Sequence, residues 1–437
     1  MSVAVIGSGF AGLAAADALV RAGVATEVYE ARDEWGGHTR SDSVEGFTFD
    51  EGPHLSFTTD DQVKAVFAAG AGEVREIDAR ITNYFHGRWI KHPAQCHLHG
   101  LDPGLVTACI VDMVAAHREP PELHNYADWC VAKFGRTFAE TFPFAYTRKY
   151  WTVDAETMSL DWIGKRIYPP SLEEVVRGAL GEPPRGDFHY LSRVRYPETG
   201  GYQAFMRGIA HPELIRTSSA VESIDPVRRS LRLAGGAEPS YDQLVSTMPL
   251  PELVSRVVPS AVPAAVRDAA GRLACSSLVL VDVAVARADL LGAEWFYVYD
   301  EDISFARAHF PHLLSARNAP EGCGSIQAEV YYSRDRPLPC AAEDLPARVV
   351  EELVEMKVLR SAGEVMFTRH RVVPFANIIF DHHRAAALAI INAWADEAGI
   401  LLAGRYGEWG YHWTDDATRS GWAAAAKVLE RVGDAAS

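Results

Sequence analysis

The stretch that decides the fold lies at the start of the chain, where residues 3–22 read VAVIGSGFAGLAAADALVRA. Val3 to Ile6 predict a short buried strand, and Leu13 to Ala22 predict a helix rich in small and aliphatic residues. Between them stand the glycines of a GxGxxG spacing, Gly7, Gly9 and Gly12. Glycine permits a tight turn, a close backbone approach to a ligand and packing of the helix against the strand. The order strand, glycine turn, helix predicts the first unit of a parallel α/β fold.

An acidic residue follows at the end of the second predicted strand. Val28 and Tyr29 end this strand, and Glu30 stands 18 positions after Gly12. A carboxylate there is placed to accept hydrogen bonds from ribose hydroxyls, while the start of the helix suits a pyrophosphate. A glycine turn alone also occurs without a ligand, but the two strands, the turn and the acid together predict dinucleotide binding.

The composition is that of a globular protein with more than one domain. The 437 residues are 48% hydrophobic and 23% charged. At ~100–200 residues per domain, this length predicts two or three lobes with clefts between them. The formal net charge of −16 argues against a nucleic-acid partner, since phosphate contacts need clustered Lys and Arg. An anionic ligand would therefore need a local arginine pocket.

Hydropathy and cysteine usage exclude further classes. No apolar run reaches the ~18–20 residues that span a bilayer, and the longest, Leu278 to Ala286, is interrupted by Asp282. The apolar N-terminal run has no basic segment before it, so we expect no signal peptide, no membrane span and a cytoplasmic protein. The six cysteines form no CxxC pair, which favours reduced thiols and no metal site. The oligomeric state stays open, with a homo-oligomer as one alternative.

The residues after Glu30 favour FAD over NAD. Arg32 is followed by Gly36-Gly37-His38 and then by Gly52-Pro53-His54. This order resembles the amine-oxidase-like group of flavoproteins, in which a GG loop follows the acidic strand end and lies along the cofactor. No second GxGxxG occurs downstream, so NADPH or NADH would bind transiently elsewhere as an external reductant.

The remaining pattern predicts an α/β fold with a discontinuous cofactor domain. Helix-compatible spacing between Ala108 and Leu180 predicts a helical insertion, and runs such as Ser277 to Val285 predict a mixed or antiparallel sheet. Ile400 to Leu402 predict a late strand before a C-terminal helix. We therefore expect three units: a Rossmann-type FAD-binding domain from residues 1–80, 195–250 and 365–437, a mainly helical insertion at 81–194, and a substrate-domain β-sheet at 251–364.

Several blocks together resemble UDP-galactopyranose mutase, particularly its eukaryotic-type branch, in order through most of the chain. Besides the N-terminal fingerprint, they are Gly52-Pro53-His54, Gly87-Arg88-Trp89-Ile90, Trp151-Thr152, Arg195-Tyr196-Pro197, Tyr241-Asp242-Gln243-Leu244, Phe305-Ala306-Arg307 and Gly404-Arg405-Tyr406-Gly407-Glu408-Trp409. That family interconverts the pyranose and furanose forms of a nucleotide-activated galactose without net redox change. The resemblance implies that reduced FAD is active, with its N5 attacking the anomeric carbon and displacing the nucleoside diphosphate.

The resemblance also implies roles for individual residues. His54 matches the histidine of a mobile loop beside the flavin. Arg166 and Arg307 match two arginines that clamp the substrate diphosphate, work that suits a planar guanidinium. Tyr411 matches a tyrosine that reaches the same phosphates, and Arg405 would contact the flavin's own pyrophosphate. The expected cofactor contacts are Gly7, Gly9, Phe10, Ala11, Gly12, Glu30, Ala31, Arg32, Gly36, Gly37, His38, Gly52, Pro53, His54, Val221, Met248, Gly404, Arg405 and Tyr411.

Two positions depart from the family pattern. Leu314 and Val373 stand where the family has tyrosines. Loss of a buried hydroxyl removes a hydrogen bond worth ~0.5–1.5 kcal/mol, or more when the partner is charged. We therefore expect a nucleotide-sugar substrate that need not be UDP-galactose, such as one with another nucleotide or with a deoxy or pentose sugar.

Two other functions fit part of the pattern. A FAD-dependent amine oxidase or desaturase would share the N-terminal fingerprint and the GG loop, oxidise its substrate and pass electrons to oxygen. A flavin-binding scaffold without catalysis would share these features too. Convergence of Arg166 and Arg307 on one cleft would favour the mutase, because the oxidases bind mostly neutral or apolar substrates.

Overall fold

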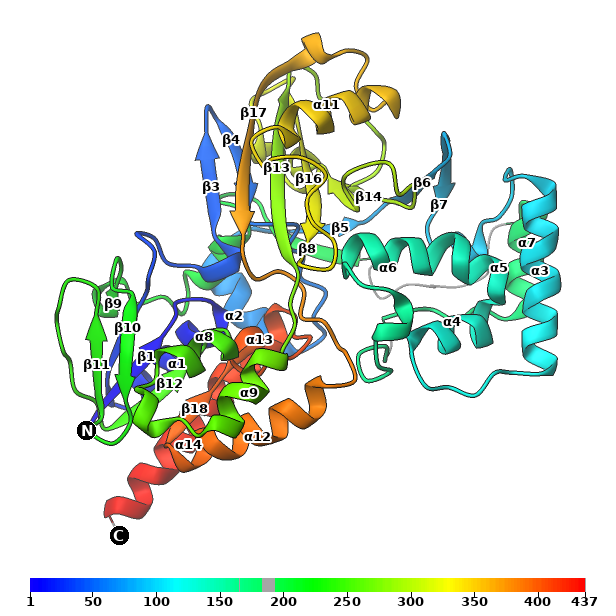
Figure 1. Cartoon of the computed structure of the whole chain (residues 1–437). Coiled ribbons are helices and arrows are strands. Elements are labelled where there is room, and N and C mark those ends of the chain that lie inside the picture. The colour runs from blue at the N-terminus through cyan, green and yellow to red at the C-terminus, as the bar shows by residue number, and fades with distance from the viewer. Residues whose placement is uncertain (165, 183–192, 437) are drawn as a thin grey trace.

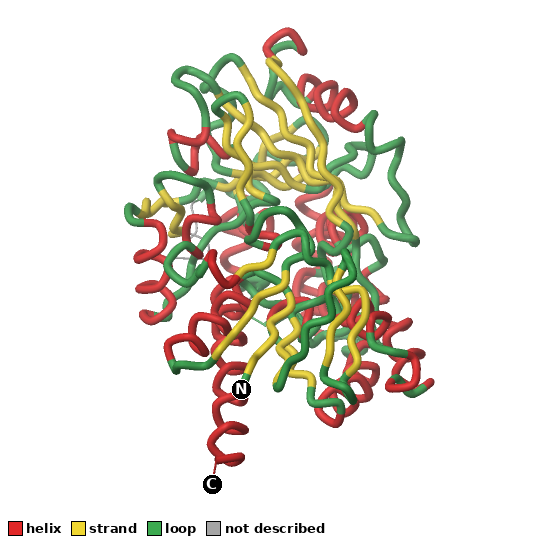
Figure 2. The backbone as a smooth tube through the Cα atoms, turned by 90° about the vertical axis from the view of Figure 1, so that its left-hand side faces the viewer, coloured by secondary structure: helices red, strands yellow, loops and turns green. Residues whose placement is uncertain are grey.

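Two large β-sheets, three two-stranded sheets and a helical lobe make up the described part of the chain (Figure 1). The computed structural model describes residues 1–164, 166–182 and 193–436, so residues 183–192 of the expected insertion lie outside the described part. In the turned view, a sheet near both termini lies below a second, larger sheet, with helices around both (Figure 2). This arrangement confirms the predicted α/β fold.

The lower sheet contains the N-terminal stretch and is entirely parallel. Its strand order is β18 (Ile400–Leu402), β12 (Gln243–Ser246), β1 (Ser2–Ile6), β2 (Ala25–Tyr29) and β9 (Ile215–Arg216). The helix after β1, α1 (Phe10–Arg21), packs against α14 (Thr414–Ala436). The two helices lie so close that a Cβ on Gly421 would stand 2.2 Å from the carbonyl oxygen of Ala11. The small residues of α1 permit this contact, which ties the C-terminal segment to the N-terminal fingerprint.

The upper sheet is mixed, as predicted. Its strand order is β17 (Val365–Val373), β13 (Ser277–Val285), β16 (Gly324–Tyr332), β15 (Arg307–His309), β14 (Trp295–Val298), β6 (Ile81–Phe85) and β7 (Arg88–Lys91). Neighbouring strands are antiparallel except β14 and β6. α11 (Leu345–Glu355) packs on β13 and covers one face of the sheet. The expected boundaries at residues 81 and 365 place β6 and β7 in the helical insertion and β17 in the FAD-binding domain. In the structure all three strands belong to the upper sheet, because β6 pairs with β14, β7 pairs with β6, and β17 pairs with β13.

The helical lobe follows β7 in the sequence. Its helices are α3 (Pro103–Arg118), α4 (Tyr126–Phe134), α5 (Arg136–Ala139), α6 (Ala145–Tyr150) and α7 (Leu172–Ala179). Asn125 caps α4 by accepting a hydrogen bond from the N–H of Asp128 at 3.0 Å. A π-helical turn, Glu140–Phe144, joins α5 to α6 and contains Pro143, whose missing N–H the wider turn accommodates.

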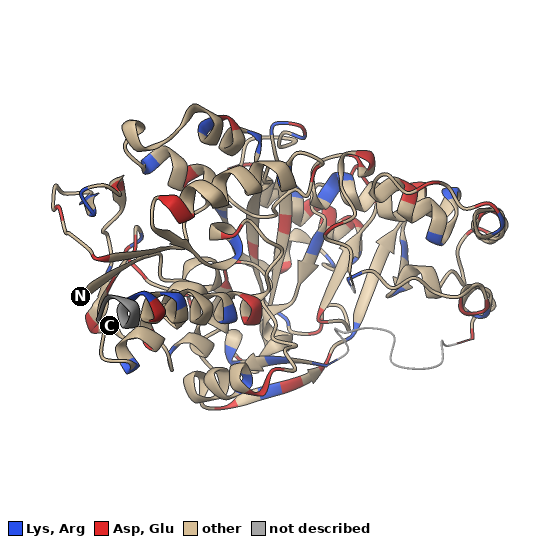
Figure 3. Cartoon of the chain, turned by 90° about the horizontal axis from the view of Figure 1, so that it is seen from below, with Lys and Arg blue, Asp and Glu red and all other residues tan. Residues whose placement is uncertain are grey.

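The other elements connect these three parts. The remaining helices are α2 (Asp61–Ala71), α8 (Leu250–Arg256), α9 (Ala264–Arg272), α10 (Pro311–Leu314), α12 (Arg384–Glu397) and α13 (Gly404–Gly407). The remaining strands are β3 (Ser41–Val44), β4 (Phe47–Asp50), β5 (Val74–Asp78), β8 (Arg193–Pro197), β10 (Val221–Asp225) and β11 (Ser230–Leu233). Among the described helices, none combines the length and apolar character needed to cross a membrane. Acidic and basic residues are interspersed along the ribbons (Figure 3), so the net negative charge is spread over the molecule.

Candidate cofactor and active site

At two positions of the N-terminal turn, Gly7 and Gly12, there is no room for a side chain. Gly7 has φ 95°, and a Cβ there would stand 2.2 Å from the side-chain oxygen of Thr247 on the neighbouring strand end. A Cβ on Gly12 would stand 1.9 Å from the carbonyl oxygen of Gly7. Both contacts are far inside van der Waals distance, so only glycine fits. The turn thus keeps its backbone bare and open to a ligand at the start of α1.

Glu30 ends β2 with its carboxylate directed at this turn. One carboxylate oxygen accepts a hydrogen bond from the backbone N–H of Ser8 at 3.0 Å, and the other accepts from the N–H of Arg32 at 3.0 Å. The hydroxyl of Ser8 also donates to Glu30. The acid therefore fastens the strand end to the glycine turn. The ribose contact expected of it stays a prediction.

A buried carboxylate links the GG loop to the loop that carries His54. Glu51 accepts hydrogen bonds from Arg32 Nη1 at 2.7 Å, Arg40 Nε at 3.0 Å and His38 Nδ1 at 2.9 Å. Burial alone would raise the pKa of Glu51, but the hydrogen bonds from His38 and Arg32 hold that pKa well below its usual range. The carboxylate is thus ionised at neutral pH and binds the two loops together.

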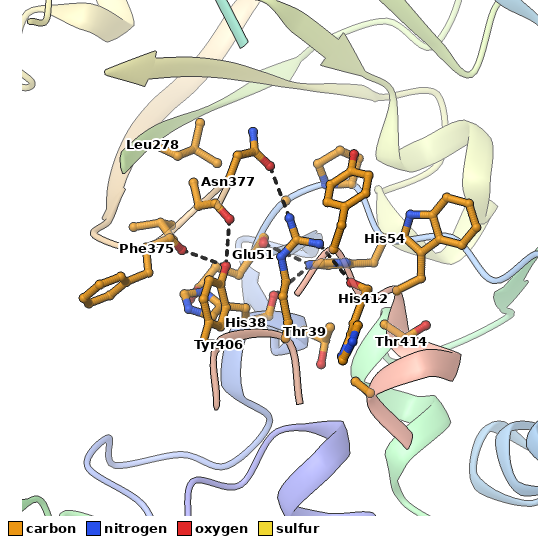
Figure 4. A pocket seen from close by; sticks show the side chains of 18 of the residues that line it. His38, Thr39, Glu51, His54, Leu278, Phe375, Asn377, Tyr406, His412 and Thr414 are labelled. Atoms are coloured by element: carbon orange, nitrogen blue, oxygen red, sulfur yellow. Dashed lines mark hydrogen bonds and ion pairs between the residues drawn. The ribbon is translucent and has the colours of Figure 1, made fainter. Parts of the chain in front are cut away.

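His54 is held by one ring nitrogen. Its Nε2 lies 2.8 Å from the carbonyl oxygen of His38 and 3.2 Å from that of Glu51, so Nε2 carries the proton and donates. Burial lowers the pKa of His54 below its usual value, which keeps the ring neutral. In the close-up view the labelled side chains of His38, Glu51 and His54 come together near Tyr406 and Asn377 (Figure 4).

One cavity of about 860 Å³ joins the predicted cofactor residues to the predicted substrate residues. Gly7 to Ala11 and Glu30 to Arg32 line it at the glycine turn, and Arg166 and Arg307 line it elsewhere. Of the predicted residues, Gly12 and Gly36 are the two that do not line the cavity. Its size, its bare glycine backbone and its reach from the parallel sheet to the upper sheet suit a molecule as long as FAD.

Arg307 enters the cavity from the upper sheet already paired with a carboxylate. Its Nε and Nη2 donate to the two oxygens of Glu329 at 2.7 and 2.8 Å, a bidentate pair between neighbouring strands β15 and β16. Glu329 is fully buried and also accepts a hydrogen bond from the hydroxyl of Tyr331. The pairing fixes the guanidinium plane and leaves Nη1 outside the bidentate pair.

Arg166 approaches the same cavity from the helical lobe. Its Nη2 donates to the carbonyl oxygen of Tyr411 at 2.9 Å, and its guanidinium carbon lies 4.3 Å from the centre of the Tyr411 ring. The guanidinium carbon of Arg405 lies 4.9 Å from the centre of the same ring, and Arg405 Nη1 donates to the carbonyl oxygen of His412 at 2.9 Å. Two guanidiniums therefore lie within cation–π distance of the Tyr411 ring. The predicted contact of Arg405 with the flavin pyrophosphate stays a prediction.

The sequence did not single out a group of tyrosines that line the cavity near Arg307. These are Tyr146, Tyr150, Tyr297, Tyr299 and Tyr331. The Tyr150 and Tyr331 rings are 4.8 Å apart, and the guanidinium carbon of Arg307 lies 5.7 Å from the Tyr150 ring. One signal was available: Gln327, Glu329 and Tyr331 alternate with Ala328 and Val330 along strand β16, which places three polar groups on one face.

The two departures from the family pattern occupy different surroundings. Val373 ends β17 and lines the cavity beside Leu278, its partner on β13. Leu314 ends the one-turn helix α10, is 1% exposed and packs in the core around α1 rather than in the cavity. The expectation that Leu314 removes a hydroxyl from the substrate site is therefore wrong, because its side chain faces the core. Only Val373 changes the cavity surface.

The glycine turn, the acidic strand end and the GG loop along one cavity define a flavin-binding protein of the dinucleotide-binding type. Residues 10–429 match the model of the family described as flavin containing amine oxidoreductase, so the chain belongs to this family. Family membership supports FAD as the cofactor and shows that the chain belongs to a family of enzymes.

Solved structures of several activities share the fold. A reduced UDP-galactopyranose mutase superposes with a TM-score of 0.91 at 24% identity, covering 98% of this chain and 95% of that one. A putative protoporphyrinogen oxidase from Exiguobacterium has a TM-score of 0.75 at 17% identity, with 98% and 99% covered. A cyclohexylamine oxidase from Brevibacterium oxydans has a TM-score of 0.70 at 15% identity, with 99% of each chain covered. At these identities the likeness shows the fold alone.

Proposed function

We propose that the protein is a flavin-dependent mutase that interconverts the pyranose and furanose forms of a nucleotide sugar. The observation that carries this proposal is the placement of Arg166 and Arg307. They come from the helical lobe and from the upper sheet, and both line the cavity that reaches the glycine turn. The structural likeness to a UDP-galactopyranose mutase supports the same reading.

The charge balance of this end of the cavity suits a diphosphate. Arg166, Arg307 and Arg405 all line it, and Glu329 pairs with Arg307. Glu329 offsets the charge of Arg307, and the guanidiniums of Arg166 and Arg405 add positive charge to the same low-dielectric site. Guanidinium forks hold phosphate oxygens in a fixed geometry, which would orient the sugar toward the cofactor.

The residues present fit FAD along the whole cavity. The N–H groups at the start of α1 would hold its pyrophosphate, Glu30 its ribose, and the loops of His38 and His54 would lie beside its ring system. When bound and reduced, FAD would supply the nucleophilic N5 of a covalent route without net oxidation. NADPH or NADH would serve as the external reductant.

His54 and the tyrosines would prepare this reaction centre. With Nε2 donating to backbone carbonyls, the neutral ring presents Nδ1 as an acceptor, able to hold a proton beside the cofactor. The tyrosine rings would exclude water, and a hydroxyl such as that of Tyr297 could donate a hydrogen bond to a phosphate or sugar oxygen, whereas the Tyr331 hydroxyl already donates to Glu329. Tyr297 and Tyr331 bring hydroxyls near Arg307, at the end of the cavity where Val373 lacks one.

The second candidate is an amine oxidase, favoured by the aromatic lining and by the family itself. A cationic amine would need an unpaired carboxylate or an aromatic cage in the cavity. Glu329 is the buried carboxylate among the tyrosines, but Arg307 already holds both of its oxygens. That pairing weighs against binding a second cation there, and so favours the mutase.

The test is turnover by the protein loaded with FAD and reduced with dithionite under anaerobic conditions. A panel of nucleotide sugars varying in base and in sugar, including deoxy and pentose forms, would be incubated and separated by chromatography. We expect a furanose product from at least one member, with no reductant consumed per turnover. Steady peroxide formation with an amine in air, and no furanose from any sugar, would instead establish the oxidase.

A further inference from the structure

Asp282, a buried carboxylate, has no part in the site described so far. Asp282 interrupts the most apolar run of the chain and lies in the middle of β13, where it is fully buried. A carboxylate in such a place costs free energy unless it is paired and hydrogen-bonded. Its partners therefore indicate what it is for.

Three side chains of neighbouring strands converge on Asp282. Gln327 Nε2 donates to one carboxylate oxygen at 2.6 Å from β16. From β17, Arg369 Nε donates to the other oxygen at 2.7 Å, and Arg371 Nη2 lies 3.3 Å from that oxygen. The register places Gln327 and Arg369 directly opposite Asp282, one on each side. Asp282 thus fixes the rotamers of an amide and two guanidiniums across three strands.

Two of these three side chains reach across to the same atom of the cofactor domain. Gln327 Nε2 donates to the backbone carbonyl oxygen of Asp50 at 2.9 Å, and Arg371 Nη2 donates to it at 2.8 Å. Asp50 is the last residue of β4, and its side chain is held separately by Ser41 and Tyr196. Both lone pairs of this carbonyl oxygen are therefore used by the upper sheet.

The chain that leaves this carbonyl carries the residues beside the predicted cofactor ring. Glu51 follows, then Gly52 with φ 100°, and His54 lies four residues beyond Asp50 with its Nε2 bound to Glu51 O. Glu51 and His54 line the cavity, whereas Asp282, Gln327 and Arg371 do not. The loop is thus fastened from behind, by groups that cannot touch a ligand in the cavity.

We propose that Asp282, acting through Gln327 and Arg371, is the positioning residue that sets the place of the His54 loop against the flavin. It holds two donors on the Asp50 carbonyl oxygen, which fixes the peptide plane from which the loop departs. The inference rests on His54 lying beside FAD, as in the proposed function, but not on the identity of the substrate or on mutase chemistry. A displacement of ~1 Å at a reacting group costs about 100-fold in rate.

The test uses FAD-loaded protein and two variants. One removes a hydrogen-bond donor to the Asp50 carbonyl oxygen, and the other removes the carboxylate charge that holds the donors in place. Gln327→Leu removes the neutral donor to Asp50, and Asp282→Asn removes the charge that orients both donors. Ser325→Ala is the matched control, because Ser325 lies on the same strand and is equally buried, but its hydroxyl accepts from the N–H of His312 outside the cavity. The readouts are bound FAD, its visible spectrum, its midpoint potential, and kcat and KM with any substrate found.

We expect Gln327→Leu and Asp282→Asn to retain FAD, to alter its visible spectrum and midpoint potential, and to lower kcat ~100-fold with little change in KM. The control should match the wild type. A Gln327→Leu protein whose spectrum and potential equal those of the wild type, with only its stability reduced, would overturn the proposal. If Asp282→Asn fails to fold, Gln327→Leu decides alone. The spectral comparison needs no turnover, so a wild type that forms no furanose refutes the mutase without deciding this inference.

Discussion

The two ends of the cavity are built in different ways. At the glycine turn, the surface is backbone from one continuous stretch, Gly7 to Ala11, with Glu30 completing it. At the other end, the surface is made of side chains from separate elements, with Arg166 near the helical lobe, Arg307 on β15 and Tyr411 near the C-terminus. The first end is fixed by local chain geometry and the second by the packing of distant segments.

Under the proposed function, the first end would bind the cofactor and the second end would select the substrate. Backbone N–H groups at a helix start recognise a pyrophosphate regardless of its neighbours, so the same turn serves many flavoproteins. Side chains on strands can be exchanged without changing the fold. Variants at the glycine turn should therefore lose FAD, whereas variants at the other end should keep FAD and lose substrate binding or activity.

The largest effect is expected for Arg307→Met. The substitution leaves the fully buried Glu329 without its cation, which should lower the free energy of unfolding by ~3–5 kcal/mol. Urea unfolding measures this loss. Adding Glu329→Gln should restore much of the stability, because no buried charge is then unpaired, while activity should stay lost. Recovery of activity in the double variant would show that Arg307 has no role beyond pairing Glu329.

The end of the cavity at the glycine turn could be predicted from the sequence because the residues that form it are close together in the chain. The spacing of the three glycines, the flanking strand and helix, and Glu30 are consecutive features with a direct geometric meaning. Arg166 and Arg307 could be proposed only through resemblance, since their sequence distance says nothing about convergence. The error at Leu314 has the same cause, because a one-turn helix gives no periodicity to show which side faces the core. The pairing of Glu329 with Arg307 likewise depends on strand register, which spacing alone does not determine.

At the backbone end, Gly12→Ala should cost at least ~1–3 kcal/mol and abolish FAD retention, because its Cβ would collide with the carbonyl oxygen of Gly7. Bound flavin per protein after gel filtration, together with the thermal midpoint, would measure both effects. Gly271→Ala is the matched control, since no atom lies within 4 Å of a Cβ there and the residue is helical. That control should instead gain ~0.5–1 kcal/mol. If the Gly12→Ala variant binds FAD as well as the wild type does, the glycine turn does not approach the cofactor closely.

The buried His309 on β15 should make the free energy of unfolding depend on pH in the acid range. Burial, with Arg307 and His54 nearby, lowers the pKa of His309 to about 3 from 6.5. The folded state then binds fewer protons than the unfolded state, so this contribution is complete above ~6.5 and is lost as the pH falls toward 3. Between neutral pH and pH ~5 the loss should be ~2 kcal/mol, and His309→Leu should remove it. Unfolding curves at both pH values, with the exposed His124→Gln as control, measure the difference, and equal acid losses in wild type and His309→Leu would contradict it.

The smallest effect is expected for Tyr411→Phe. The ring that lies near both Arg166 and Arg405 remains, and only the hydroxyl offered to a ligand is removed. Loss of one hydrogen bond to a phosphate should weaken binding by ~1 kcal/mol, about fivefold in Kd. Titration calorimetry with a nucleoside diphosphate would show this shift at unchanged thermal stability. An unchanged Kd would place the diphosphate elsewhere in the cavity.

The most direct measurement of the central claim is the affinity of the reduced, FAD-loaded protein for a nucleoside diphosphate, compared between wild type and Arg166→Met. We expect the wild type to bind the diphosphate and the variant to bind it ~10–100-fold more weakly while retaining FAD, because a charge-assisted contact is lost. Equal affinity in both proteins, or binding of a primary amine but of no diphosphate, would contradict the assignment of this cavity to a nucleotide sugar.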